Sequence, residues 1–334
     1  MNKLTIIITL AGCVAVCNAV AAEKTADNVN AHLTAAAKAA GYDHIGIYNT
    51  TCARLGDPAG GRAAPVPHDR DASVWAAPPA RVFDQLYWLG EHAAYESHPS
   101  AWALDTADGI IVIDALHTNS VEQQVVGGLK KLGLDPKRIK YVLVTHAHGD
   151  HFGGAKYLHD TFGAHVMMSA ADWNFLESQK GPSEDIKPQR DMVITDGQKF
   201  TLGKTTLTLY VTPGHTPGTV SLLVPVTDGG QPHLAAMWGG TGWTFSAADP
   251  DARKLQVFKS YHDSAVRFRD IIGKAGPDVM LGNHSYLDLA EQKNAVLATR
   301  KPGEPNPWVM GRERALAYLD VAVECSAAGL ASFR

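Results

Sequence analysis

Thr145-His146-Ala147-His148-Gly149-Asp150-His151 is the stretch that decides the fold of this chain, because it places three imidazoles and a carboxylate within a few residues. The residues before it, 139–144 (IKYVLV), have the β-branched and aromatic content of a buried strand, and Gly153-Gly154 marks a turn beyond it. The polar side chains are therefore expected on a loop at the end of a strand. Imidazole and carboxylate groups are preferred ligands of Zn²⁺, so the stretch predicts a metal site.

The alternative interpretation of this stretch is a polar loop that faces solvent. With 15 His in 334 residues, independent placement produces His-x-His-x-Asp-His in roughly two or three chains per thousand, before a preceding strand is required. Chance is therefore a poor explanation of the spacing.

Two later segments end apolar runs with a histidine. Residues 212–218 read TPGHTPG and contain His215, and residues 280–284 read MLGNH and end at His284. Together with the first motif they resemble the metal motifs of the metallo-β-lactamase superfamily, over about residues 82–298. The resemblance implies an α/β fold, the αββα sandwich of that superfamily, with a di-metal site at one edge of the sheets.

Carried over residue by residue, the resemblance implies one zinc bound by His146, His148 and His215 and a second bound by Asp150, His151 and His284. Each of the two Zn²⁺ ions would have three protein ligands and an open position, which is typical of a catalytic site. The nucleophile implied is a metal-bound hydroxide that attacks an amide or ester carbonyl. Asp150 is then also the catalytic residue, because it would orient that nucleophile.

One segment departs from many members of the superfamily. Glyoxalase II, the lactonases and the tRNA-processing nucleases carry an Asp that bridges both metals in a segment of the type GDT, whereas residues 238–243 here read WGGTGW. The first two subclasses of metallo-β-lactamase use Cys there, and the third uses a residue that is not a ligand. The chain therefore resembles the third subclass, which predicts hydrolysis of a β-lactam ring. The alternatives are an esterase or lactonase acting on another small cyclic or aryl ester, and a metal-binding protein without catalysis.

Bulk composition is typical of a single enzyme domain. The formal charge is −4 and 45% of residues are hydrophobic, which is enough for one large core. The chain has no basic run that would bind nucleic acid, and no apolar run outside its N-terminus is long enough for a membrane span. We expect a monomer whose partner is a small-molecule substrate.

The N-terminus is predicted to be a targeting segment. Lys3 supplies a positive charge, residues 4–20 are mostly apolar, and Ala19-Val20-Ala21 is a small-residue cleavage site. This predicts a signal peptide at residues 1–22 and a periplasmic or secreted bacterial protein. Leu10-Ala11-Gly12-Cys13 also resembles a lipobox, so anchoring as a lipoprotein through Cys13 stays open. The remaining boundaries are an N-terminal extension at 23–80, the catalytic domain at 81–300, and a C-terminal tail and helix at 301–334.

Removal of the signal peptide would leave one pair of cysteines, Cys52 and Cys325. An oxidising compartment permits a disulfide, and two buried free thiols are the alternative, because sequence does not show whether the two Cα atoms come close. A disulfide would tie the extension to a C-terminal helix at about 312–324. Its reduction is expected to loosen the extension and to spare the zinc-bearing core.

The coarse map of the rest follows apolar periodicity and turn residues. It predicts strands at 82–90, 100–106, 109–116, 207–212, 219–226, 233–240 and 278–282, and helices at 26–40, 120–132, 155–161, 170–177 and 265–275. Asp114 is predicted to be a hydrogen-bond partner of a ligand His. Trp238 and Trp243 are either core residues or the lining of a substrate groove, and Ser285 and Tyr286 are candidate substrate contacts. His117 and His262 are the other histidines of interest.

Overall fold

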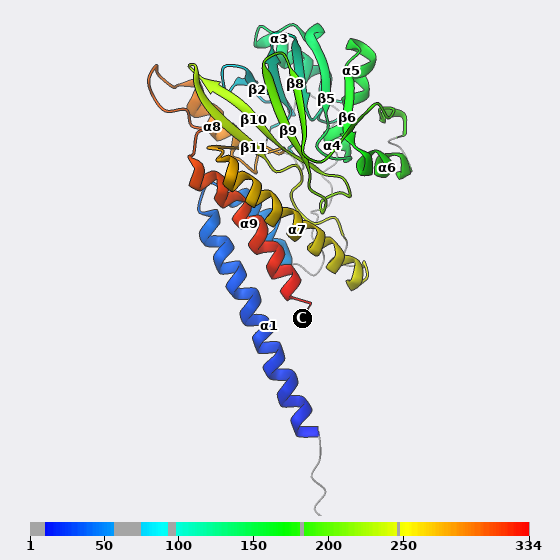
Figure 1. Ribbon diagram of the computed structural model, residues 1–334, viewed down its shortest axis with the longest axis vertical. Helices are drawn as coiled ribbons and strands as arrows, with labels where there is room; N and C mark the ends of the chain where they lie inside the picture. Colours follow the sequence, from blue (N-terminus) through cyan, green and yellow to red (C-terminus); the bar gives the residue numbers. More distant parts are fainter. Residues whose placement is uncertain (1–10, 57–74, 93–97, 181–183, 246–247, 334) are drawn as a thin grey trace, which may run out of the picture.

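Two β-sheets packed face to face form the centre of the molecule, as the computed structural model shows (Figure 1). The structure describes residues 11–56, 75–92, 98–180, 184–245 and 248–333, and of residues 11–25 it describes the backbone alone. The first ten residues of the predicted signal peptide and residues 57–74 of the predicted N-terminal extension lie outside these ranges.

The first sheet has seven strands that lie in chain order. They are β1 (Ala80–Arg81), β2 (Leu86–Trp88), β3 (Trp102–Thr106), β4 (Gly109–Ile113), β5 (Ile139–Leu143), β6 (His165–Ser169) and β7 (Met192–Ile194). The pairs from β1 to β4 are antiparallel, and those from β4 to β7 are parallel. Parallel strands end at the same edge, so the loop after β5, which carries the first motif, lies at the carboxyl edge of this half of the sheet.

The second sheet has five strands in the order β12-β11-β10-β9-β8. They are β8 (Gln198–Leu202), β9 (Thr205–Val211), β10 (Val220–Asp228), β11 (Gln231–Met237) and β12 (Val279–Leu281). Only the pair β11 and β12 is parallel.

Alternation along the strands separates three apolar layers. In β4, Ile111 and Ile113 face the layer between the two sheets, while Ile110 and Val112 face the layer beneath the helices that cover the first sheet. In β10, Leu222 faces the middle layer and Leu223 faces the helices that cover the second sheet. Both sheets are therefore buried on two faces, and the predicted αββα sandwich is confirmed.

The helices divide between the two outer faces. α3 (Gly127–Lys131), α4 (Gly149–Phe152), α5 (Ala155–Phe162) and α6 (Ala170–Ser178) cover the first sheet, and α1 (Ala11–Ala40), α2 (Ile45–Thr50), α7 (Asp251–Ala275) and α9 (Arg312–Ala331) cover the second. α8 (Ala290–Ala298) follows the last strand. Short helical turns lie at Cys52–Gly56, Glu122–Val126, Pro136–Arg138 and Glu184–Ile186.

The N-terminal part of the chain is a long helix against α9. α1 begins at Ala11 rather than at residue 26, and its N-terminal half extends past the end of α9 (Figure 1). It ends before Gly41, whose φ of +50° suits a residue without a side chain. No helix among the described residues is long and apolar enough to cross a membrane.

Cys52 and Cys325 are joined by a disulfide, with 4.8 Å between their Cα atoms. The sequence left two alternatives open, a disulfide and two buried free thiols, and the structure has the disulfide. Both residues are buried in the layer that joins α1, α7 and α9 to the second sheet.

Several predicted boundaries were wrong for local reasons. β4 ends at Ile113 rather than at 116, because Asp114 and Leu116 adopt positive φ angles of 59° that break the strand. The predicted helix at 120–132 is a π-helical turn followed by the short α3, which opens on two weak helix formers, Gly127 and Gly128. β6, β7, β8, α8 and the charged first half of α7 were not predicted.

Candidate metal centre

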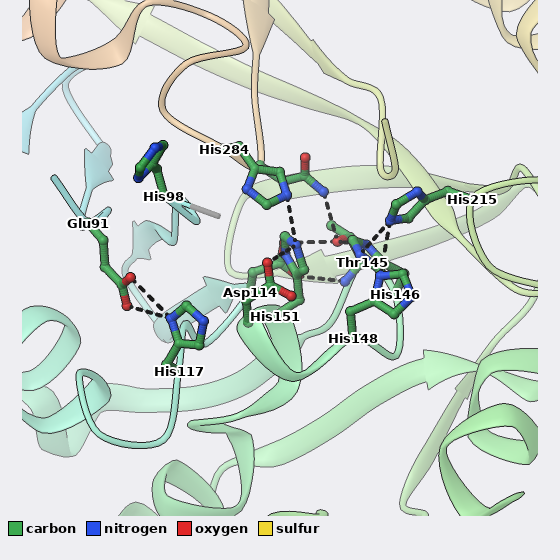
Figure 2. Close-up of polar contacts among 12 residues, drawn as sticks. Glu91, His98, Asp114, His117, Thr145, His146, His148, His151, His215 and His284 are labelled. Atoms are coloured by element: carbon green, nitrogen blue, oxygen red, sulfur yellow. Dashed lines mark hydrogen bonds and ion pairs between the residues drawn. The ribbon is translucent and has the colours of Figure 1, made fainter. Parts of the chain in front are cut away.

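Six predicted ligands meet where loops of both sheets end at the same edge. His146 and His148 lie in the loop after β5, and Asp150 and His151 lie in the first turn of α4. His215 comes from the loop after β9, and His284 from the loop after β12. Figure 2 shows the histidine rings converging from these separate elements.

The six side chains form two groups of three, each of which could hold one metal ion. His146, His148 and His215 form the first group, and Asp150, His151 and His284 form the second. Within each group the potential ligand atoms lie within 4.8 Å of one another. These are the two groups that the sequence predicted.

Nitrogen–nitrogen distances in both groups suit a tetrahedral metal ion. Nε2 of His215 lies 3.1 Å from Nε2 of His146 and 3.1 Å from Nδ1 of His148. Nε2 of His151 lies 3.2 Å from Nε2 of His284. Ligands about 2.0–2.1 Å from a tetrahedral zinc are about 3.3 Å apart, so each group can hold zinc with little rearrangement.

Hydrogen bonds at Nδ1 determine which nitrogen of His146 and of His215 faces the metal site. Nδ1 of His146 lies 2.9 Å from the carbonyl oxygen of Gly239, and Nδ1 of His215 lies 3.1 Å from that of Gly242. A carbonyl can only accept, so Nδ1 carries the proton and Nε2 presents a lone pair. Two lone pairs 3.1 Å apart repel each other unless a cation lies between them. The donor set therefore fits a metal ion better than it fits a hydrogen-bonded cluster.

Asp114 is a fully buried partner of the second group, as the sequence predicted (Figure 2). Its Oδ2 accepts from Nδ1 of His151 at 2.7 Å and from the Thr145 hydroxyl at 2.8 Å, and its Oδ1 accepts from the Thr145 amide at 2.7 Å. One carboxylate thereby connects the start of the first motif to its last ligand. Such partners hold a ligand ring in orientation and raise its basicity.

Asp172 is a buried carboxylate that supports the loops of the first group without contacting a ligand ring, and the sequence did not indicate it. Its Oδ2 accepts from the Ala147 amide at 2.9 Å and from the Thr216 hydroxyl at 2.7 Å, while its Oδ1 accepts from the Gly218 amide at 2.7 Å. It therefore joins the loop of His146 and His148 to the loop of His215. The available signal was an acidic residue in the first turn of α6, three positions after the cap Ser169.

Electrostatics differ between the two groups. Burial and neighbouring imidazoles hold the pKa values of His146 and His215 well below the usual range, so both rings are neutral, as ligands must be. Burial opposes protonation of His151, but the carboxylates of Asp150 and Asp114 outweigh it and raise its pKa. Burial opposes ionisation of Asp150, but the surrounding imidazoles lower its pKa. The second group thus has the negative potential that attracts a cation.

The segment after β11 leaves no room for a side chain at Gly240. A Cβ at Gly240 would lie 2.6 Å from Cβ and 2.8 Å from Cδ2 of His215. Among the described residues, neither metal group includes a residue of 238–243, or Asp249 or His262.

The remaining residues of interest divide between core and site. Trp238 is buried and donates to the Tyr261 hydroxyl, so it is a core residue, and the half-buried Trp243 packs on Tyr261 and Phe258. His262 lies away from the site, with Nδ1 3.0 Å from the Ser326 hydroxyl.

Three residues adjoin the second group. The Tyr286 ring lies 5.4 Å from that of His284, and Ser285 is buried beside it. Nδ1 of His117 lies 3.1 Å from both carboxylate oxygens of Glu91, a partner that the sequence did not indicate (Figure 2).

Comparisons with known proteins show the family of this chain. The family model described as the metallo-beta-lactamase superfamily matches residues 94–228. A hydroxyacylglutathione hydrolase of Acidiphilium cryptum is 31% identical over 218 residues, which cover 65% of this chain and 74% of that protein. An N-acyl homoserine lactonase of a Bacillus species is 30% identical over 166 residues, covering 48% of this chain and 62% of that protein.

A solved structure extends the similarity to the whole fold. The crystal structure of a subclass B3 metallo-beta-lactamase of Bradyrhizobium japonicum matches with a TM-score of 0.58 and 24% identity, covering 74% of this chain and 92% of that chain. The chain belongs to the metallo-β-lactamase superfamily.

Proposed function

We propose that this protein is a zinc-dependent hydrolase that opens a β-lactam ring. His146, His148 and His215 would hold one Zn²⁺, and Asp150, His151 and His284 the other. The observation that carries the choice of substrate is the segment at Gly240, where the His215 side chain leaves no room for a Cβ and hence for a bridging carboxylate on that residue. The third subclass of metallo-β-lactamase shares this lack of a ligand, and the B3 enzyme of Bradyrhizobium japonicum shares the fold.

The chain's own residues orient the reaction. When bound, two zinc ions polarise the scissile carbonyl and lower the pKa of a water molecule, so that a nucleophile is available at neutral pH. The Asp150 carboxylate, whose pKa the surrounding histidines lower and which is 19% exposed, would accept a hydrogen bond from the attacking water and then its proton. Asp114 and Asp172 keep the ligand loops in place, so little reorganisation is needed during the reaction.

A second candidate is hydrolysis of another small ester, thioester or lactone. The matches to a hydroxyacylglutathione hydrolase and to an N-acyl homoserine lactonase favour it. The same metal centre can serve several carbonyl substrates, because a fold does not determine the substrate. A binding protein without turnover is the least favoured, since three ligands per metal leave a position open for chemistry.

One experiment separates the candidates. The purified protein is assayed with a chromogenic cephalosporin, an N-acyl homoserine lactone and an acylglutathione, each with and without a zinc chelator. Chelator-sensitive hydrolysis of the cephalosporin at the highest kcat/KM supports the proposal. A preference for either of the other two selects the second candidate, and no turnover of any substrate argues for binding alone.

We also propose that the protein is exported to the periplasm or secreted and acts as a monomer. Support comes from the apolar N-terminus and from the disulfide, since disulfides persist in oxidising compartments. Radiolabelled palmitate incorporation in the native host, compared with a Cys13→Ser variant, would distinguish a lipoprotein from a free protein.

A further inference from the structure

Residues 45–52, called here the anchored segment, are fixed to α9 at both ends. At the start, Nε2 of His44 lies 2.7 Å from the carbonyl oxygen of Arg314, while Nε of Arg314 donates to the Asp43 carboxylate at 2.9 Å. At the end, Cys52 is bonded to Cys325. The anchored segment therefore has a fixed position relative to the second sheet.

This segment contacts the loop that carries His284. Gly46 is packed so closely that a Cβ on it would lie 2.0 Å from the carbonyl oxygen of Tyr286. The Tyr286 side chain also interacts with the side chain of Thr50. Because the Tyr286 ring lies against His284, Thr50 supports a ligand of the second group.

The same residue contacts the loop that orients His215. A Cβ on Gly242 would lie 3.3 Å from Cγ2 of Thr50, so the Thr50 methyl group packs directly on this glycine. Gly242 is the residue whose carbonyl accepts from Nδ1 of His215. Thr50 is 7% exposed and its hydroxyl donates to the Gly46 carbonyl at 2.8 Å, which fixes its rotamer. One side chain thus touches the support of both metal groups, its methyl group on one side and its hydroxyl on the other.

We propose that Thr50 is a positioning residue of the metal centre and that the Cys52–Cys325 disulfide holds it there, so that zinc affinity depends on the bridge. This inference rests on the proposed di-zinc centre. The sequence alone predicted that reduction would spare the core, but the Thr50 contacts connect the bridge to both ligand loops. Loss of an outer partner of a metal ligand typically costs about 10- to 100-fold in metal affinity.

The test measures the two zinc dissociation constants by competition with a chromophoric chelator. Thr50→Val keeps a methyl group against Gly242 but removes the hydroxyl, so it should weaken the second site by up to about 10-fold, the lower end of this range, because Thr50 acts through Tyr286. Thr50→Ser keeps the hydroxyl but removes the methyl group, so it should weaken the first site. The Cys52→Ser/Cys325→Ser double variant should weaken both. The control is His32→Ala, which breaks the His32–Glu324 pair between α1 and α9 without contacting the anchored segment, and it should bind zinc as the wild type does.

The zinc affinities of these variants support or contradict the role of Thr50. Wild-type affinity at both sites in both Thr50 variants, or in a folded double variant, would overturn it. Should the double variant lack native circular dichroism, the Thr50 variants, which keep the disulfide, decide alone. A wild-type protein that binds no zinc would contradict the proposed function itself, whereas tight wild-type binding with unchanged variants contradicts only the role of Thr50.

Discussion

Asp114 and His151 form a fully buried carboxylate–imidazole pair, in which Nδ1 of His151 donates to Oδ2 of Asp114 at 2.7 Å. Asp114 adopts a φ of 59°, a conformation that Asn tolerates well. Asp114→Asn therefore changes the charge and the acceptor while leaving the backbone unstrained. We expect the zinc affinity of the second site to fall about 10- to 100-fold, measured by chelator competition. The first site should change less, because Asp114 reaches Nδ1 of His146 only through the Thr145 hydroxyl, 3.1 Å away from it. Equal affinities at both sites before and after the change would show that Asp114 only stabilises the fold.

Asp150→Ala should lower kcat by orders of magnitude, because it removes both a proposed ligand of the second metal and the group proposed to orient water. His165→Ala is the matched control, since its ring lies on the surface with Nδ1 3.0 Å from the Asp191 carboxylate. Steady-state kinetics on the best substrate compare the two variants. Near-normal turnover in Asp150→Ala would refute the assigned role.

Asp172→Asn should destabilise the fold and the first metal site together. Both carboxylate oxygens of Asp172 accept from donors, so an amide group would turn its own N–H toward at least one of them. A buried donor without an acceptor costs about 1–3 kcal/mol. Urea unfolding of the metal-free protein measures the loss, with the exposed Asp160→Asn on α5 as the control. A loss no larger than that of Asp160→Asn would contradict the role of Asp172.

His44 should make the metal-free protein sensitive to acid. Burial, the largest cause, lowers its pKa from 6.5 to about 4. The unfolded chain therefore binds a proton between these values that the folded chain does not, so stability falls as pH drops from 6.5 towards 4. The contribution is on the order of 3 kcal/mol. His44→Gln can still donate to the Arg314 carbonyl but does not titrate, and it should flatten this part of the curve of unfolding free energy against pH. If the curve of His44→Gln instead runs parallel to that of the wild type, other groups cause the acid sensitivity.

The strands and ligands that the sequence predicted share a local signal. β4 is a continuous apolar run and β5 and β10 are mostly apolar, and His146, His148, Asp150 and His151 follow β5 within one motif. Along β8, exposed residues alternate with half-buried ones, and both kinds are of mixed polarity. β7 has only three residues. The sequence of neither strand therefore differs clearly from that of a loop. Each ligand motif follows a strand, but the division of the ligands into two groups came from the resemblance to the superfamily, because strand ends alone do not show which loops meet.

Features that depend on distant parts of the chain could not be predicted. The disulfide requires that α9 return beside residue 52, which no local pattern encodes. Asp172 bonds to Ala147 and Gly218, which are remote in sequence, and its position in α6 looks like an ordinary helix start. Thr50 was not noticed because its two contacts, Gly242 and Tyr286, come from different loops.

The central claim is that six side chains hold two zinc ions, and metal analysis of the purified protein tests it most directly. Zinc per chain is measured by inductively coupled plasma mass spectrometry for the wild type and for His148→Ala and His284→Ala, which each remove one ligand from a different group. We predict two zinc ions in the wild type and about one in each variant, because three ligands are needed to hold each ion. One zinc ion or none in the wild type, or two in both variants, would contradict the account.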